Sequence, residues 1–349
     1  MPTNEEIESD EQRKLQVTGG STFILSMPKE WVKRNQLKKG SALFLHEEDE
    51  GTLTIMPPKL VRQEKQEDAI IRVALNENPD SVTRKIVSAY LVGYSILHVK
   101  AQGQHQLPSK VRNTIKTFTR HLLVGTEIVT DTPADLTLQV LLNYSELSVQ
   151  SAMRRMAIIA ASMHKEAVAS LRNQDVQTAK AVIETDDEVD RFNLYVIRLL
   201  KLAVSKPRIF KEIGIDGAKG GLAYRLITKA IERTADHATR IAENVILLNE
   251  KPDEALIEKI EQLSKLAIGM FEDSIESMFR KDYNLAESII QKLDKIVELE
   301  KAAIISSKTF SIEQVSSLRL LIESVRRTAE YATDVSEVVL NMNIESVLG

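Results

Sequence analysis

The chain begins with a short pattern of alternating polar and apolar residues. Residues 13–26 alternate and then run apolar, and Gly19 and Gly20 between the two runs supply the positive φ angles of a tight hairpin turn. Pro28 suits the first turn of a short helix, and a second hairpin is expected across residues 47–50. About 45 residues of this ββ-helix-ββ kind bury too little apolar surface to stand alone, so we expect a second copy to complete the core.

A different rhythm runs from residue 69 to residue 143, where apolar runs of strand length alternate with helical segments. Helices are predicted from Asp80 and after Pro108. Strands are predicted in the stretches 69–75, 95–101, 126–131 and 136–142. This order, βαβαββ, predicts a small α/β domain.

From Glu146 the helical period continues almost to the end, with breaks at 207–221, at Pro252 and at 308–313. Residues 230–245 match residues 324–339 with an offset of 94, and an upstream pair of segments matches with an offset of 107. The difference places 13 extra residues in the 207–221 connection of the first copy. We therefore expect two related bundles of three helices each.

The expected architecture is multidomain: a small β domain, an α/β domain and an all-α pair of bundles. Its length of 349 residues and its composition, 43% hydrophobic and 28% charged, suit a globular protein of several domains. The expected domains are 11–57, 69–143, 146–250 and 253–345.

Residues 11–46 hold seven Lys or Arg against two Glu, a net charge of +5, which leaves −9 for the remainder of a chain of net charge −4. Such segregation is evidence for an anionic partner of the N-terminal domain. A run of about 18 apolar residues is absent and the first ten residues are acidic, so we expect a cytoplasmic protein without membrane insertion. Without cysteine, any metal must be held by oxygen or imidazole.

Two carboxylates fall where apolar side chains are expected. Asp186 and Asp190 lie in the middle of the apolar face of their helix, and Glu232 and Asp236 lie beside the apolar stripe of the next helix. A carboxylate on a core face must be protonated, paired or bound to a cation. Four oxygen-bearing side chains on two helices suit iron, manganese, magnesium or zinc, with Glu243 in the same line and His237 as a further candidate ligand.

The alternative is that Asp186 and Asp190 pair with basic side chains at a partly solvated groove, the candidates being Arg191, Arg198 and Arg233. The second bundle departs from the first, because Arg326 stands where Glu232 stood and Val297 stands where Asp190 stood. Its nearest acids are Asp294, Glu298, Glu330 and Glu337, and Tyr331 replaces His237. We therefore expect the cation site in the first bundle.

The stretch RKLQVTGGSTFILSMPKEWVKRNQLKKGSALFL resembles the AbrB/SpoVT type of DNA-binding domain, in which two chains interleave their hairpins. ETDDEVDR and IERTADHATRIAEN resemble the metal-binding motifs of PhoU, the phosphate uptake regulator family. Together they resemble archaeal PhoU-like regulators. The resemblance implies a swapped-hairpin dimer, and a metal cofactor, in that family a multinuclear cluster, at Asp186, Asp190, Glu232 and Asp236.

A dimer would double the basic patch to about +10 and present it twice to DNA phosphates. Small basic β domains also serve purely for dimerisation or for toxin binding, which stays an alternative. The residues expected to contact DNA are Arg13, Lys14, Ser21, Thr22, Lys29, Lys33 and Arg34.

We expect a homodimeric transcriptional regulator linked to phosphate uptake or metal status. The alternative is a phosphate-signalling adaptor that contacts a transporter or a sensor kinase without specific DNA binding. A di-metal enzyme ranks last, because no acid, base or nucleophile stands out beside the acidic residues. We therefore expect no enzymatic activity.

Overall fold

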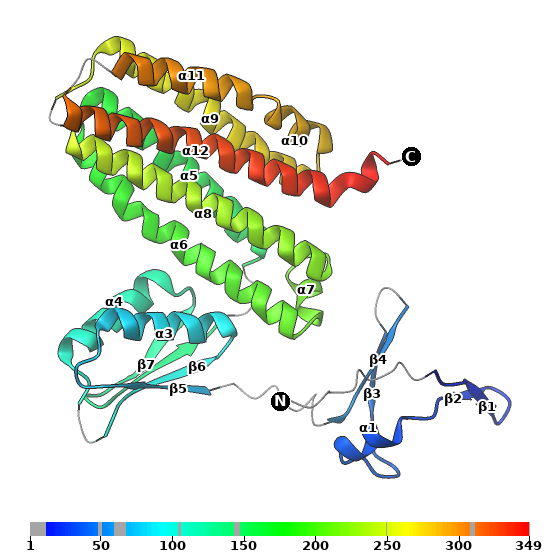
Figure 1. The fold of residues 1–349 in the computed structure, drawn as a ribbon. Coiled ribbons are helices and arrows are strands. Elements are labelled where there is room, and N and C mark those ends of the chain that lie inside the picture. The colour runs from blue at the N-terminus through cyan, green and yellow to red at the C-terminus, as the bar shows by residue number, and fades with distance from the viewer. Residues whose placement is uncertain are drawn as a thin grey trace, which may run out of the picture. The chain divides into compact units, whose positions relative to one another are not determined.

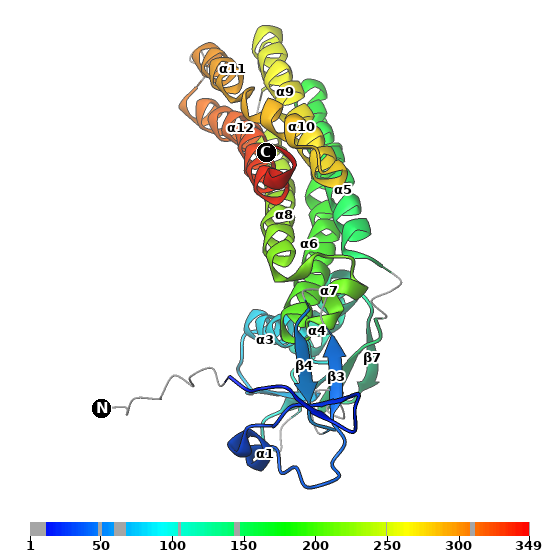
Figure 2. The same ribbon diagram turned by 90° about the vertical axis from the view of Figure 1, so that its right-hand side faces the viewer.

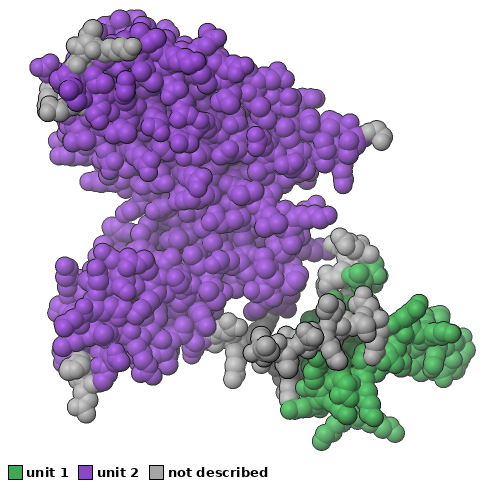
Figure 3. All heavy atoms as spheres, viewed as in Figure 1, with its two compact units in different colours: residues 1–65 green, residues 66–349 purple. Residues whose placement is uncertain are grey.

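The chain divides into two compact units, residues 1–65 and residues 66–349 (Figure 3). The computed structural model describes residues 12–47, 51–58, 68–103, 106–142, 147–248, 250–307 and 311–348. None of the helices in these ranges is both long enough and apolar enough to cross a membrane.

The N-terminal unit has the hairpin, helix, hairpin order that the sequence predicts. Strands β1 (Gln16–Thr18) and β2 (Thr22–Ile24) pair antiparallel, and the turn between them uses positive φ angles of 61° and 86° at Gly19 and Gly20. Helix α1 (Lys29–Arg34) follows Pro28, and β3 (Phe44–Glu47) pairs with β4 (Leu53–Met56). The tip of the second hairpin, residues 48–50, lies outside the described residues.

A single copy of this unit has no apolar core among its described residues. Phe23 is 65% exposed and Leu45 is 64% exposed, and α1 contains no buried residue. Both clusters of buried apolar side chains lie in the second unit. Because large apolar side chains gain about 25 cal/mol for each Å² removed from water, this exposed surface favours association with another apolar surface.

The second unit begins with the predicted βαβαββ segment. Its strands are β5 (Asp68–Val73), β6 (Ile96–Ala101), β7 (Thr126–Asp131) and β8 (Asp135–Val140). They form one sheet of order β5-β6-β8-β7, parallel between β5 and β6 and antiparallel elsewhere. Helices α3 (Pro79–Val92) and α4 (Ser109–Leu122) pack on one face, with Ile86 and Ile115 buried against strand residues such as Leu97 and Leu138.

The described residues from 147 to 348 are mainly helical, as Figures 1 and 2 show. The first bundle contains α5 (Val149–Asn173), α6 (Val176–Ser205), α7 (Arg208–Glu212) and α8 (Gly217–Leu247). The second contains α9 (Glu254–Arg280), α10 (Tyr283–Ile290), α11 (Leu293–Ser306) and α12 (Ile312–Asn343), followed by the 3-10 helix η2 (Ile344–Ser346). The short helix α7 occupies the longer connection of the first copy, and α10 with α11 corresponds to the unbroken α6.

The duplication is visible in the local geometry. Gln174 and Lys281, which are 107 positions apart, both end a helix in the left-handed conformation, with φ of 49° and 55°. The next residues, Asp175 and Asp282, both accept a backbone hydrogen bond at the start of the following helix. Equivalent sequence positions therefore form the same turn in both bundles.

One polar side chain joins the two bundles inside their shared core. His164 of α5 is fully buried, and its Nε2 lies 2.9 Å from Ser264 Oγ of α9 while its Nδ1 lies 3.2 Å from Thr328 Oγ1 of α12. Burial lowers the pKa of His164 to about 4. The neutral ring therefore belongs to the folded state.

This pKa predicts an acid-dependent stability term. Between pH 6.5 and about 4 the unfolded chain binds a proton at His164 that the folded chain does not. The contribution of His164 to the free energy of unfolding is therefore complete above pH 6.5 and is lost as the pH falls from 6.5 to about 4. Urea unfolding of the wild type and of His164→Gln should give a stability difference that shrinks on acidification, by at most about 1.4 kcal/mol per pH unit. The Asp and Glu side chains titrate in both proteins, so their effect cancels in the comparison. A stability difference between the wild type and His164→Gln that does not change with pH would contradict the prediction.

Candidate functional site

The four predicted carboxylates come together between two helices that pack side by side. Asp186 and Asp190 on α6 and Glu232 and Asp236 on α8 are all half-buried, and we name them the acidic groove. Burial, followed by the charge of Asp190 and those of the α8 acids, raises the pKa of Asp186 to about 7. Burial and the α8 acids raise the pKa of Asp190 to about 6, and the pKa of Asp236 is raised by burial and by Glu232. The groove thus concentrates negative charge that the protein balances incompletely.

Basic side chains do little to balance the groove. Lys229 binds Glu232, whereas neither Asp186 nor Asp190 forms an ion pair with a residue that the structure describes. Arg198, one of the partners considered for these aspartates, instead donates to the backbone carbonyl oxygens of Tyr90 and Gly93. Arg233 is exposed, and its guanidinium lies 5.9 Å from the ring centroid of Tyr331. The ion-pair interpretation therefore fails for Arg198 and is unsupported for the others.

The four side chains of the acidic groove have the right ligand atoms for a cation, but in this structure their oxygens are not arranged around one point. Carboxylate oxygens in a half-buried, uncompensated cluster are ligands for hard or borderline cations. Within the described residues, however, no three His, Asp or Glu side chains are arranged so that they could hold a metal ion. Ion binding would therefore require the four side chains to rotate toward one another.

Two further residues assigned to this site lie elsewhere. His237 Nε2 is 3.1 Å from Tyr331 Oη, with the ring centroids 5.6 Å apart, so His237 lies at the contact between α8 and α12. The structure places His237 against the other bundle and not among the four carboxylates, because adjacent positions on a helix point in different directions. Glu243 is exposed, so its carboxylate is not one of the half-buried set.

In the second bundle an arginine fills the corresponding position. Arg326 Nε lies 2.9 Å from Glu300 Oε1, and its Nη1 contacts Glu330, the counterpart of Asp236. Asp294 and Glu298 are exposed, and Glu298 pairs with Lys295 on the surface. At this position a guanidinium thus pairs with Glu300 and Glu330, whereas the corresponding position of the first bundle holds Glu232 and adds a negative charge.

The predicted DNA-contacting residues are all exposed on the N-terminal unit. Ser21 and Thr22 lie at the β1–β2 turn, and α1 presents three cations on one short helix. Among these cations, Lys33 lies 3.1 Å from the carboxylate of Glu30, whose side chain is 76% exposed. Such a surface pair is weak and leaves Lys33 available to phosphate. The exposed set is Arg13, Lys14, Ser21, Thr22, Lys29, Lys33 and Arg34.

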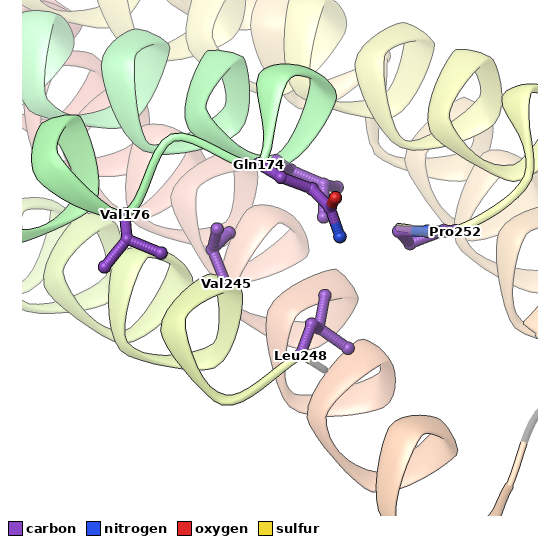
Figure 4. A pocket seen from close by; sticks show the side chains of 6 residues that line it. Gln174, Val176, Val245, Leu248 and Pro252 are labelled. Carbon is purple, nitrogen blue, oxygen red and sulfur yellow. The ribbon is translucent and has the colours of Figure 1, made fainter. Parts of the chain in front are cut away.

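A separate hollow of about 220 Å³ lies where the α5–α6 turn meets the end of α8 (Figure 4). Gln174 is the one lining residue with a polar side chain, and none of the four carboxylates contributes to the hollow. Its lining residues are Leu171, Gln174, Val176, Val245, Leu248 and Pro252.

The sequence did not reveal the role of Arg198. Its side chain is buried, lies 4.7 Å over the ring of Tyr90 and donates to Gly93 O at 3.1 Å. Gly93 ends α3 at φ 117°, and a Cβ there would lie 2.5 Å from Leu202 of α6. Arg198 thus joins the α/β segment to the same helix that carries Asp186 and Asp190. An arginine on an otherwise apolar helix face was the available signal.

Comparison with known proteins agrees with this architecture. The PhoU domain family matches residues 153–245 and 260–339, one segment in each bundle. The family described as antidote-toxin recognition MazE, bacterial antitoxin, matches residues 16–63. These matches define a PhoU-domain protein with duplicated three-helix bundles. It also carries an N-terminal domain of the MazE/AbrB-like kind, as the hairpin pattern predicts.

Two curated relatives carry the name phosphate-specific transport system accessory protein PhoU homolog. The protein from Aquifex aeolicus is 30% identical over 147 residues, which cover 42% of this chain and 64% of that protein. The protein from Clostridium acetobutylicum is 22% identical over 199 residues, covering 54% of this chain and 88% of that protein. The crystal structure of PhoU from Pseudomonas aeruginosa has a TM-score of 0.50 at 18% identity, covering 57% of this chain and 96% of that one, and supports the fold alone.

Proposed function

We propose that this protein is a homodimeric DNA-binding regulator whose PhoU domain links transcription to phosphate uptake or to cation status. The observation that carries the proposal is the exposed basic surface of a MazE/AbrB-like unit on the same chain as a PhoU domain. The relatives' names connect such domains with phosphate transport. The chain's role is regulatory, and its location is cytoplasmic.

Dimerisation through the N-terminal unit is supported by the absence of an apolar core among its described residues. The apolar side chains of both hairpins are exposed in one copy, and pairing two copies would remove them from water. The pairing also brings two basic surfaces together on one particle, which suits the symmetry of a DNA duplex.

Residues 1–65 expressed alone should therefore fold only as a dimer. Its unfolding midpoint should rise with protein concentration, because folding and association are one equilibrium. Sedimentation and thermal unfolding at several concentrations test this. Replacing the exposed Phe23 by Asp should leave the fragment unfolded. A wild-type fragment that is folded and monomeric would refute the proposed dimer.

DNA binding itself is tested with the full chain by fluorescence anisotropy on labelled duplexes over a salt series. Binding that weakens steeply with salt supports the regulator, because cation release from phosphates drives the association. No binding at low salt would instead favour the adaptor, or a toxin-binding role for the N-terminal unit. Sequencing DNA fragments retained by the protein would then identify the operator.

We further propose that the acidic groove binds a cation, iron, zinc, manganese or magnesium, or a cluster of them. Asp186, Asp190, Glu232 and Asp236 would be the ligands, and the ion would add positive charge to that of Lys229, which pairs with Glu232. Protons and the ion would compete for the same oxygens, since burial and repulsion raise the pKa of the aspartates.

A further inference from the structure

Strand β5 forms one edge of the four-stranded sheet, and β7 forms the other. The two edges differ. The pairing of β7 is interrupted by a bulge between Ile128 and Thr130, a device that twists an edge away from further pairing. The register of β5 is regular along Asp68–Val73, and the strand contains no proline and no lysine. Its outer side has no strand partner among the described residues (Figure 1).

The side chains of β5 alternate between the helix-covered face and the other face of the sheet. Ile71 and Val73 are buried beneath the helices. Asp68, Ile70 and Arg72 share the opposite face and are exposed, Ile70 by 56% and the Asp68 side chain by 51%. An acid and a base thus stand at equal distances on either side of an exposed apolar residue.

This pattern is complementary to itself in one register. If two copies of β5 run antiparallel with Ile70 opposite Ile70, each Asp68 lies opposite the other copy's Arg72 on the same face. Two opposite-charge pairs then flank one apolar pair. A shift by one residue would place exposed side chains opposite buried ones, so the register is well specified.

We infer that β5 pairs with the β5 strand of a second copy, joining two four-stranded sheets into one continuous sheet about a twofold axis at Ile70. The pairing satisfies the backbone groups of an edge that has no strand partner in the part of the chain that the structure describes. Strand β5 begins at Asp68, close in sequence to the end of the N-terminal unit at residue 65. Dimerisation of that unit, which is part of the proposed function, would therefore raise the local concentration of the second strand.

Disulfide formation in the full chain tests the register, because the natural sequence contains no cysteine. Opposed residues in an antiparallel pair lie about 4.5–5.5 Å apart at Cα, within reach of a disulfide. Ile70→Cys should form a disulfide between chains under mild oxidation. Ser88→Cys, on the exposed side of α3, is the matched control and should stay reduced at the same protein concentration.

Charge exchange then tests the partner. In the Ile70→Cys background, Asp68→Arg or Arg72→Asp alone places like charges opposite each other and should slow disulfide formation at least fivefold. Coexpression of these two variants with different tags should restore the disulfide selectively in mixed pairs. In a mixed pair, one chain has arginine at both positions and the other has aspartate at both, so each cross-strand pair joins opposite charges.

Three results would overturn the inference: a disulfide no faster than that of Ser88→Cys, a rate unaffected by the charge changes, or an Ile70→Cys thiol that is protected from maleimide in a chain free of disulfide. The last would mean that another segment or protein covers β5. Failure of N-terminal dimerisation is seen separately in the isolated fragment. If the N-terminal units do not dimerise, the disulfide between β5 strands should still form, but its rate should depend on protein concentration.

Discussion

The full chain with both Lys33→Ala and Arg34→Ala is expected to bind DNA on the order of a thousandfold more weakly in 0.1 M salt. A dimer loses four cations, and each phosphate contact contributes about 0.9 to the slope of log K against log salt. The salt slope should therefore fall by about 4, and the loss should be nearly uniform across DNA sequences, because phosphate contacts carry little sequence information. Anisotropy titrations over a salt series measure both quantities.

The matched control is Lys180→Ala with Lys201→Ala, which removes the same charge from exposed positions of α6. This variant should bind DNA nearly as the wild type does. Equal losses in both variants would mean that net charge rather than the N-terminal surface attracts DNA. Unchanged affinity in the Lys33 and Arg34 variant would favour the adaptor function.

Asp190→Asn with Asp236→Asn is expected to abolish cation binding by the acidic groove. A neutral amide oxygen cannot supply the charge that offsets dehydration of a polyvalent ion. Elemental analysis after reconstitution with iron, manganese, zinc and magnesium measures the loss. Glu330→Gln, at the equivalent of Asp236 in the second bundle, should retain the wild-type metal content because Arg326 already neutralises that site.

Without metal, the variant with both Asp190→Asn and Asp236→Asn should also be more stable than the wild type at pH 8. The pKa of Asp190 in the folded state, about 6, lies above its ordinary value of 3.8. Asp190 therefore contributes favourably to the free energy of unfolding at low pH, and this contribution is lost as the pH rises through 6. An ion-pair role predicts the opposite change. A wild type that takes up none of these metals would refute the cation site and leave the fold assignment intact.

Most of the fold was predictable because it follows from local chemistry. Gly19 and Gly20 fix a hairpin turn, and strand and helix periods separate the α/β segment from the bundles. The acidic groove was predictable because a helical wheel shows which residues share a face. Asp186 and Asp190 stand out there since carboxylates are costly on a core face.

The remaining features depend on which helix packs against which face, and a wheel does not contain that information. His237 is adjacent to a predicted ligand in sequence but lies against Tyr331. Arg198 could have paired with aspartates a few turns away, yet it binds the end of α3, which comes from a segment over 100 residues earlier. The outer edge of β5 became recognisable only once the strand order was known.

His237 and Tyr331, 94 positions apart, meet each other across the two bundles. Equivalent residues touch in this way when two identical halves associate about a symmetry axis, so the arrangement is that expected of an ancestral gene that encoded one bundle and formed a homodimer. Fusion of two such genes would free each copy to change alone. In a homodimer of one gene product, both halves carry the same residue at equivalent positions. The duplicated chain, in contrast, has Glu232 in one half and Arg326 at the equivalent position of the other.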